Sequence, residues 1–78
     1  MKYAYVLENE NAEHFYVGLT DDLRARLAKH NAGEVPHTSK YRPWRIKTYV
    51  AFSNTERATA FERYLKSASG RAFARKRL

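Results

Sequence analysis

Hydrophobic and polar residues alternate in three short stretches of the chain, and this period of two predicts three β-strands. Residues 2–8 (KYAYVLE) and 14–18 (HFYVG) flank a polar turn at 9–12, so they predict a β-hairpin. Residues 44–52 (WRIKTYVAF) predict a third strand. We expect the large apolar side chains of this strand to share one face: Trp44, Ile46, Val50 and Phe52.

The pattern changes to a helical period after Gly18, which we expect to end the second strand where a backbone kink is inexpensive. Thr20 or Asp21 is a suitable N-cap for a helix that runs to about His30. Residues 31–43 contain Gly and Pro and predict a loop.

Two more helices are predicted in the last third of the chain. Ser53 and Glu56 have the spacing of a capping box for a helix over residues 54–66, and a break at 67–70 precedes a short basic helix over 70–78. The order ββαβαα predicts an α+β fold with a small three-stranded, at least partly antiparallel sheet flanked by helices. Without repeats or a linker, we expect one domain over residues 1–78.

Charge is distributed unevenly along this chain of net charge +7. Residues 1–22 hold one Lys and five acidic residues, whereas residues 23–78 hold 14 basic and three acidic residues. Such a basic balance favours a polyanionic partner, and nucleic acid is the hypothesis we adopt. The cations that we expect to bind it are Arg24, Lys29, Lys40, Arg42, Arg71, Arg75, Lys76 and Arg77.

Composition excludes several other classes. The chain has no Cys, so neither a disulfide nor a thiolate metal site is expected. No apolar run approaches the roughly 20 residues that a membrane span needs, and the N-terminal stretch does not resemble a signal peptide. We therefore expect a cytoplasmic protein without a membrane partner.

Polar side chains border the predicted apolar faces at a few positions. Glu62 lies beside the apolar stripe of the second helix, where a carboxylate needs a metal or a cationic partner, and Arg57, Arg63 or Lys66 could serve. The stripe itself consists of Ala58, Phe61 and Leu65. A single Glu at such a border is more often paired with a neighbouring cation than with a metal.

The first helix and the hairpin carry a second group of polar residues. Arg26 and His30 are spaced i,i+4 and flank the helix face on which Leu23 and Leu27 meet the core. The pair could reach a phosphate, or it could be part of an ordinary solvated basic face. Tyr5 and Tyr16 lie on the two predicted hairpin strands, and their hydroxyls could lie close together, although each could equally be an ordinary half-buried aromatic residue.

The order and spacing of these positions resemble the GIY-YIG nuclease superfamily, specifically its small stand-alone branch of predicted endonucleases. Tyr3-Ala4-Tyr5 stands at the first family motif, and Tyr16-Val17-Gly18 is close to the second, with ten residues between the two motifs. The segment DDLRARLAKHNAGE is similar to the helix with the family's Arg, and RATAFERYLKS is similar to the segment with its metal-binding Glu. The resemblance extends over essentially the whole chain, although Leu19 stands where many members have Lys.

The resemblance implies hydrolysis of phosphodiester bonds in DNA with one divalent cation, Mg²⁺ or Mn²⁺. Glu62 would hold the metal, and Arg26 would bind the phosphate. Tyr5 would be the best candidate for general base, and His30 would share the proton transfer. Tyr16 would position the water or the phosphate. Without a recognition domain, selectivity for single-stranded, flap or branched DNA is expected rather than sequence specificity, with a role in DNA repair or recombination. The alternative is a non-catalytic nucleic-acid-binding module with the same fold.

Overall fold

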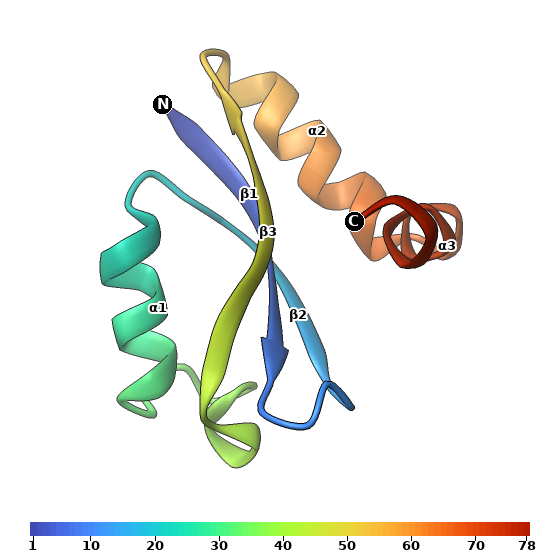
Figure 1. Ribbon diagram of the computed structural model, residues 1–78. Coiled ribbons are helices and arrows are strands. Elements are labelled where there is room, and N and C mark those ends of the chain that lie inside the picture. The colour runs from blue at the N-terminus through green and yellow to red at the C-terminus, as the bar shows by residue number, and fades with distance from the viewer.

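The computed structural model describes residues 1–78 and contains one sheet and three α-helices (Figure 1). Strands β1 (Lys2–Asn9), β2 (Phe15–Thr20) and β3 (Trp44–Phe52) lie in the order β2-β1-β3, and both pairs are antiparallel. The helices are α1 (Leu23–Asn31), α2 (Thr55–Lys66) and α3 (Ala68–Arg77), and a short 3₁₀ turn (Ser39–Tyr41) precedes β3. The α+β class and the order of elements are therefore as predicted.

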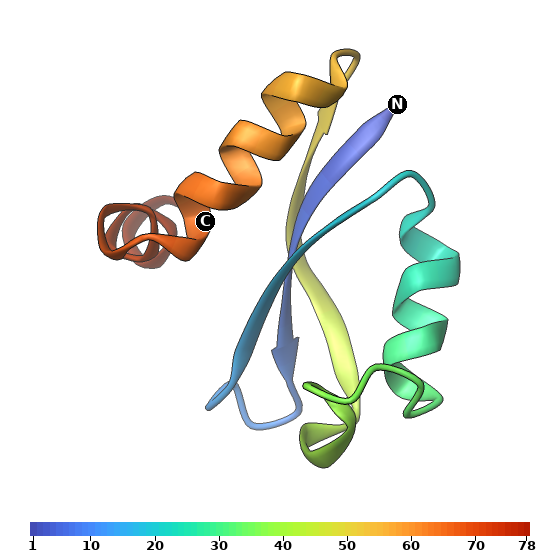
Figure 2. The ribbon, with the colours of Figure 1, turned by 180° about the vertical axis from the view of Figure 1, so that it is seen from behind.

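The helices cover the two faces of the sheet unequally. Helix α1 lies against one face, and α2 with α3 lies on the other side, as the two opposite views show (Figures 1 and 2). The α1 face holds the core of Tyr5, Leu7 and Trp44, against which Leu23 and Leu27 of α1 pack. None of the helices has the length and apolarity that a membrane crossing requires.

The pairing of β3 with β1 contains a bulge, which contradicts one prediction. Leu7 pairs with Ile46 but Val6 pairs with Thr48, so one extra residue of β3 is inserted between the two pairs. An extra residue reverses the alternation of faces beyond it. Trp44 and Ile46 accordingly belong to the α1 side, whereas Phe52 packs against Phe61 of α2 with ring centroids 5.6 Å apart. The expected single apolar face of residues 44–52 is therefore wrong.

The N-caps of the first two α-helices are also one or two residues away from their predicted positions. Asp22, rather than Thr20 or Asp21, caps α1 by accepting a hydrogen bond from the backbone of Ala25 at 3.0 Å. Asn54 caps α2 in the same way, so Ser53 does not form the predicted capping box. Ser, Thr, Asp and Asn all serve as N-caps, and neighbouring residues of these types leave the choice to tertiary packing.

Helix α3 follows α2 after a single residue, which makes the predicted break at 67–70 too long. Ser67 ends α2 and caps α3, with its hydroxyl oxygen accepting from the backbone of Gly70 at 3.1 Å. Gly70 is packed so closely that a Cβ there would collide with the carbonyl group of Tyr64. The tight connection holds α3 firmly beside the end of α2.

Candidate functional site

The ring of Tyr5 extends from β1 across its neighbouring strand β2. Tyr5 pairs with Gly18, and a Cβ at Gly18 would collide with the Tyr5 ring and hydroxyl. Gly18 lies inside β2 and does not end it, in contrast to the prediction. The function of this glycine is therefore to leave room for the phenol, which reaches the edge of the sheet because β2 is an edge strand.

A chain of buried hydrogen bonds fixes which groups donate protons. The Thr38 hydroxyl donates to the carbonyl of Val35 at 3.3 Å, so its oxygen accepts from His30 Nδ1 at 2.8 Å. His30 Nε2 is then the unprotonated ring nitrogen, and it accepts from the Tyr5 hydroxyl at 3.1 Å. Trp44 Nε1 donates to the carbonyl of Thr38 at 2.8 Å and completes the chain.

Burial keeps both members of the Tyr5–His30 pair uncharged. His30 and Thr38 are each 1% exposed, and no buried side-chain polar atom of the protein lacks a hydrogen-bond partner. Burial, together with the positive charge of Arg26, lowers the pKa of His30 below its ordinary 6.5. The pKa of Tyr5 is raised to about 12, mainly by burial. Tyr16 and Glu62 raise this pKa further, and together they outweigh the lowering caused by Arg26. The nearby cation therefore does not produce a phenolate in the free protein.

The other predicted catalytic residues lie around this pair. The ring of Tyr16 on β2 lies 4.8 Å from that of His30 and 6.3 Å from that of Tyr5, measured between centroids. Arg26 on α1 and Glu62 on α2 are both close enough for their charges to change the pKa of Tyr5. The fold thus brings together all five predicted residues from β1, β2, α1 and α2: Tyr5, Tyr16, Arg26, His30 and Glu62.

Glu62 has a cationic partner and is also suited to a divalent ion. Its carboxylate, 14% exposed, accepts through Oε2 from Lys66 Nζ at 2.6 Å, which is one of the pairings foreseen from the sequence. No group of three or more His, Asp or Glu side chains forms a preassembled metal cage. Mg²⁺ commonly takes only one or two carboxylates and completes its shell with water and substrate phosphate. The second oxygen of Glu62 fits that requirement.

The predicted nucleic-acid-binding cations do not form one patch. Arg24 and Lys29 are exposed on α1, and Lys40 and Arg42 are exposed at and just after the 3₁₀ turn. Arg71 and Arg75 of α3 line a hollow beside β2, whereas the Lys76 and Arg77 positions are exposed near the end of α3. The predicted cations are therefore divided among α1, the region of the 3₁₀ turn and α3.

Sequence patterns missed the supports of the pair. Thr38, which orients His30, lies in a polar loop where no periodicity marks a buried residue. Asn31 exchanges two hydrogen bonds with the backbone of Trp44, at 3.0 and 2.6 Å, and so ties the end of α1 to the start of β3. The only sequence signal for these contacts is the presence of the small polar residues Asn31 and Thr38 within the loop 31–43.

Comparison with known proteins places this arrangement in a family. The model of the GIY-YIG catalytic domain matches residues 1–77, and the chain therefore belongs to the GIY-YIG family. A UPF0213 protein of Streptococcus pyogenes serotype M5 (strain Manfredo) is 38% identical over 71 residues, which cover 90% of this chain and 76% of that protein. A UPF0213 protein of Lacticaseibacillus paracasei is 38% identical over 65 residues, covering 82% and 72%.

A solved structure supports the same assignment. The solution NMR structure of a UPF0213 protein from Bacillus halodurans is similar, with 31% sequence identity and a TM-score of 0.57, over 96% of this chain and 81% of that one. The resemblance seen in the motifs Tyr3-Ala4-Tyr5 and Tyr16-Val17-Gly18 is thus confirmed, and so is the fold.

Proposed function

We propose that this protein is a divalent-metal-dependent endonuclease that hydrolyses phosphodiester bonds in DNA. The observation that carries the proposal is the buried hydrogen bond from Tyr5 to His30, with Arg26, Tyr16 and Glu62 placed around it. A purely binding module would not need a proton acceptor at that depth, since a buried neutral His adds no charge toward phosphate. Membership of the GIY-YIG family, whose model describes a catalytic domain, supports the same conclusion.

Tyr5 and His30 supply a proton relay in this mechanism. A water attacks phosphorus and transfers a proton to the Tyr5 oxygen, while the Tyr5 hydroxyl proton passes to Nε2 of His30. Because the two transfers are coupled, a free phenolate is not needed, and the raised pKa of Tyr5 presents no obstacle. The lowered pKa of His30 keeps Nε2 free to accept at neutral pH.

Arg26, Tyr16 and Glu62 have complementary functions. Arg26 donates to the phosphate oxygens and stabilises the negative charge that increases as the pentacovalent transition state forms. Tyr16, beside His30, positions the water or the phosphate. Glu62 would hold the divalent ion, which when bound would polarise the phosphate and stabilise the leaving oxygen.

The substrate that we propose is DNA with unpaired regions: single strands, flaps or branches. The predicted cations are divided among α1, the region of the 3₁₀ turn and α3 instead of lying along one recognition helix. Binding of this kind depends on phosphate neutralisation and is sensitive to salt rather than to sequence. A function in DNA repair or recombination would use such selectivity.

A panel of labelled substrates tests the proposal. Single-stranded, duplex, flap and branched DNA of matched length should be incubated with Mg²⁺ or Mn²⁺, and with EDTA as the control. We expect cleavage that needs the metal and is fastest on substrates with unpaired regions. Binding without cleavage on every substrate would instead favour a nucleic-acid-binding module that has lost activity.

A further inference from the structure

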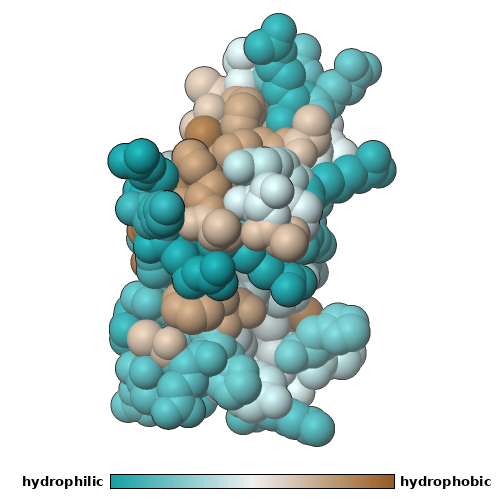
Figure 3. All heavy atoms as spheres, turned by 90° about the vertical axis from the view of Figure 1, so that its right-hand side faces the viewer, coloured by the Kyte–Doolittle hydropathy of each residue, from teal (hydrophilic) through white to brown (hydrophobic).

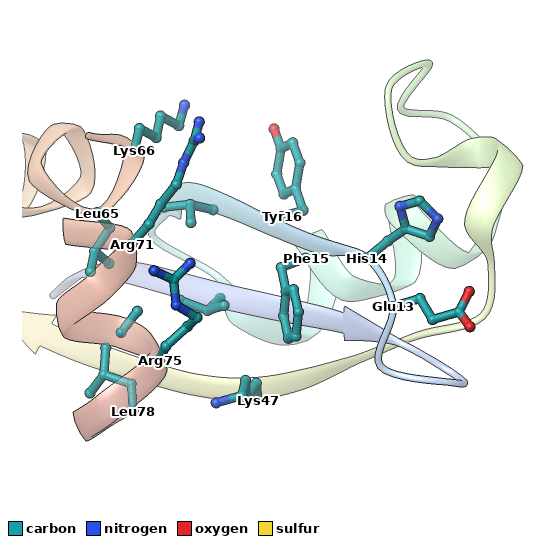
Figure 4. A pocket seen from close by; sticks show the side chains of 13 residues that line it. Glu13, His14, Phe15, Tyr16, Lys47, Leu65, Lys66, Arg71, Arg75 and Leu78 are labelled. Atoms are coloured by element: carbon teal, nitrogen blue, oxygen red, sulfur yellow. The ribbon is translucent and has the colours of Figure 1, made fainter. Parts of the chain in front are cut away.

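A hollow of about 490 Å³ lies between α3 and the β2–β3 part of the sheet, on the face opposite α1 (Figure 4). Its floor is apolar and is formed mainly by Val6, Phe15, Val17, Leu65 and Leu78. Apolar surface is visible between hydrophilic side chains on the side of the molecule that carries α2 and α3 (Figure 3). The volume lies in the range of about 300–1,000 Å³ that is typical of ligand pockets.

The rim of the hollow is strongly basic. Lys47, Lys66, Arg71 and Arg75 line it, against Glu13 as the only acidic residue. Lys66 is paired with Glu62, but the other three cations make no ion pair within the protein. In Figure 4, Arg71 and Arg75 extend from α3 along one side of the hollow, with Phe15 across from Arg75. Unpaired cations around an apolar floor are complementary to a ligand with an apolar body and negative charge.

Phe15 is an unusual residue for the solvent-accessible side of an edge strand. It is 55% exposed and joins none of the aromatic pairs of the protein, whereas the exposed rings of Tyr64 and Phe73 pack on each other with centroids 5.9 Å apart. A free ring face in a basic concavity is what single-stranded nucleic-acid-binding proteins offer to a base.

Continuity with the proposed active site is given by Tyr16. Tyr16 follows Phe15 on β2, lines the hollow, and also packs beside His30. The two side chains lie on opposite sides of β2 (Figure 4). If a phosphate of a DNA strand lies beside Tyr16, a neighbouring nucleotide of that DNA strand can therefore reach the Phe15 ring.

We propose that this hollow binds an unpaired nucleotide next to the scissile phosphate, with the base stacked on Phe15 and the phosphates near Lys47, Arg71 and Arg75. This inference rests on the proposed nuclease function for its location beside the reacting phosphate. Bases within a duplex are already stacked on one another and cannot enter. The hollow thus supplies a physical reason for selectivity toward unpaired DNA.

Fluorescence anisotropy in EDTA tests the proposal without cleavage. The probes are an oligothymidine of about 12 nucleotides and a blunt duplex, a length within the usual range of single-strand sites. Phe15→Leu, which keeps apolar bulk but removes the ring, should weaken binding of the single strand by about tenfold, and that of the duplex by less than about twofold. Phe15→Tyr should retain wild-type affinity, and Phe73→Ala is the matched control, with no effect expected on either probe.

Two further measurements distinguish a loss of base stacking from a folding defect of the variant. A single abasic position moved along the oligonucleotide should weaken binding to the wild-type protein at one location, and that position should have no effect on Phe15→Leu. Arg75→Ala should weaken binding of the single strand more than Arg77→Ala, which lies on the same helix outside the hollow.

Equal losses for single strand and duplex, no loss at all, or an altered oligomeric state of Phe15→Leu with unchanged binding would each overturn the proposal. These outcomes differ from failure of the nuclease function, which would appear as absent cleavage in the substrate panel while the Phe15 effects on binding persisted.

Discussion

The two faces of the sheet differ in how their polar groups are arranged. On the α1 face, a buried chain of hydrogen bonds from Tyr5 through His30 to Thr38 leaves each polar atom with a defined partner. On the face of α2 and α3, an apolar floor is open to solvent, and three of the cations beside it have no partner in the protein. Hydrogen-bond donors and acceptors in fixed positions are suited to proton transfer, whereas cations without partners are suited to binding an anionic ligand.

This contrast predicts a division of functions. Changes on the α1 face should reduce the rate of cleavage with little effect on binding, and changes at the α3 hollow should reduce binding with little effect on the rate at saturation. Glu62 is the exception, because it belongs to α2 yet its charge acts on Tyr5.

Glu62→Ala should have the largest effect, with metal-dependent cleavage falling by several orders of magnitude. The variant removes the carboxylate that we assign to the divalent ion, whose charge stabilisation is worth several kcal/mol. Glu56→Ala, at an exposed position on the same helix, is the control and should cleave normally. Single-turnover rates with Mg²⁺ measure both, and thermal unfolding should confirm that Glu62→Ala still folds. Wild-type rates for Glu62→Ala would contradict the metal assignment.

Arg26→Ala should slow cleavage on the order of 100-fold or more, since one preorganised donor at a developing charge contributes about 2.7–4 kcal/mol. Lys29→Ala, on the exposed side of the same helix, should change the rate by less than about twofold and weaken binding slightly. Cleavage at saturating protein and binding in Ca²⁺ separate the two effects. If both variants lose the same amount of rate, the assignment of Arg26 is wrong.

The pH dependence should report the neutral state of His30. Because the pKa of His30 lies below 6.5, cleavage should fall only when the pH drops through that lowered value. The free energy of unfolding should also decrease as the pH falls below 6.5, since the unfolded chain then binds a proton that the folded protein does not. Arg26→Met removes one cause of the shift, so NMR titration of His30 should show a higher pKa in this variant. A pKa of His30 at or above 6.5 in the wild type would contradict the buried relay.

Gly18→Ala is expected to have the smallest effect. It should reduce the free energy of unfolding by about 1–3 kcal/mol. The added Cβ would collide with the Tyr5 ring and force it out of its place over β2. The chemical-denaturation midpoint measures the loss, and cleavage should fall with it because the Tyr5 hydroxyl moves away from His30. An unchanged midpoint would show that the ring has room to move and that the α1 face is less rigid than its hydrogen bonds suggest.

The sequence predicted the elements well because their signals are local. Alternation in residues 2–8 and 44–52 found the strands, and helical spacing found the helices. The bulge in β3 escaped because a one-residue insertion changes the faces without changing composition. The caps at Asp22 and Asn54 were missed by one residue, since Asp21 and Ser53 have equally suitable side chains.

The candidate site was predictable only where family motifs mark it. Tyr5, Tyr16, Arg26, His30 and Glu62 stand at motif positions, and the fold brings them together. Thr38 and the direction of each hydrogen bond depend on contacts between distant segments, which no spacing along the chain reveals. The raised pKa of Tyr5 is of the same kind, because it is caused mainly by burial, which depends on contacts between distant segments.

The most direct test of the relay compares Tyr5→Phe with Tyr3→Phe in single-turnover cleavage with Mg²⁺. Both residues lie on β1, but Tyr3 packs against Tyr49, whereas the hydroxyl of Tyr5 donates to His30. We predict that Tyr5→Phe, which keeps the ring over Gly18, slows cleavage on the order of 100-fold or more, and that Tyr3→Phe stays within about twofold of the wild type. Cleavage by Tyr5→Phe at the wild-type rate would contradict the account.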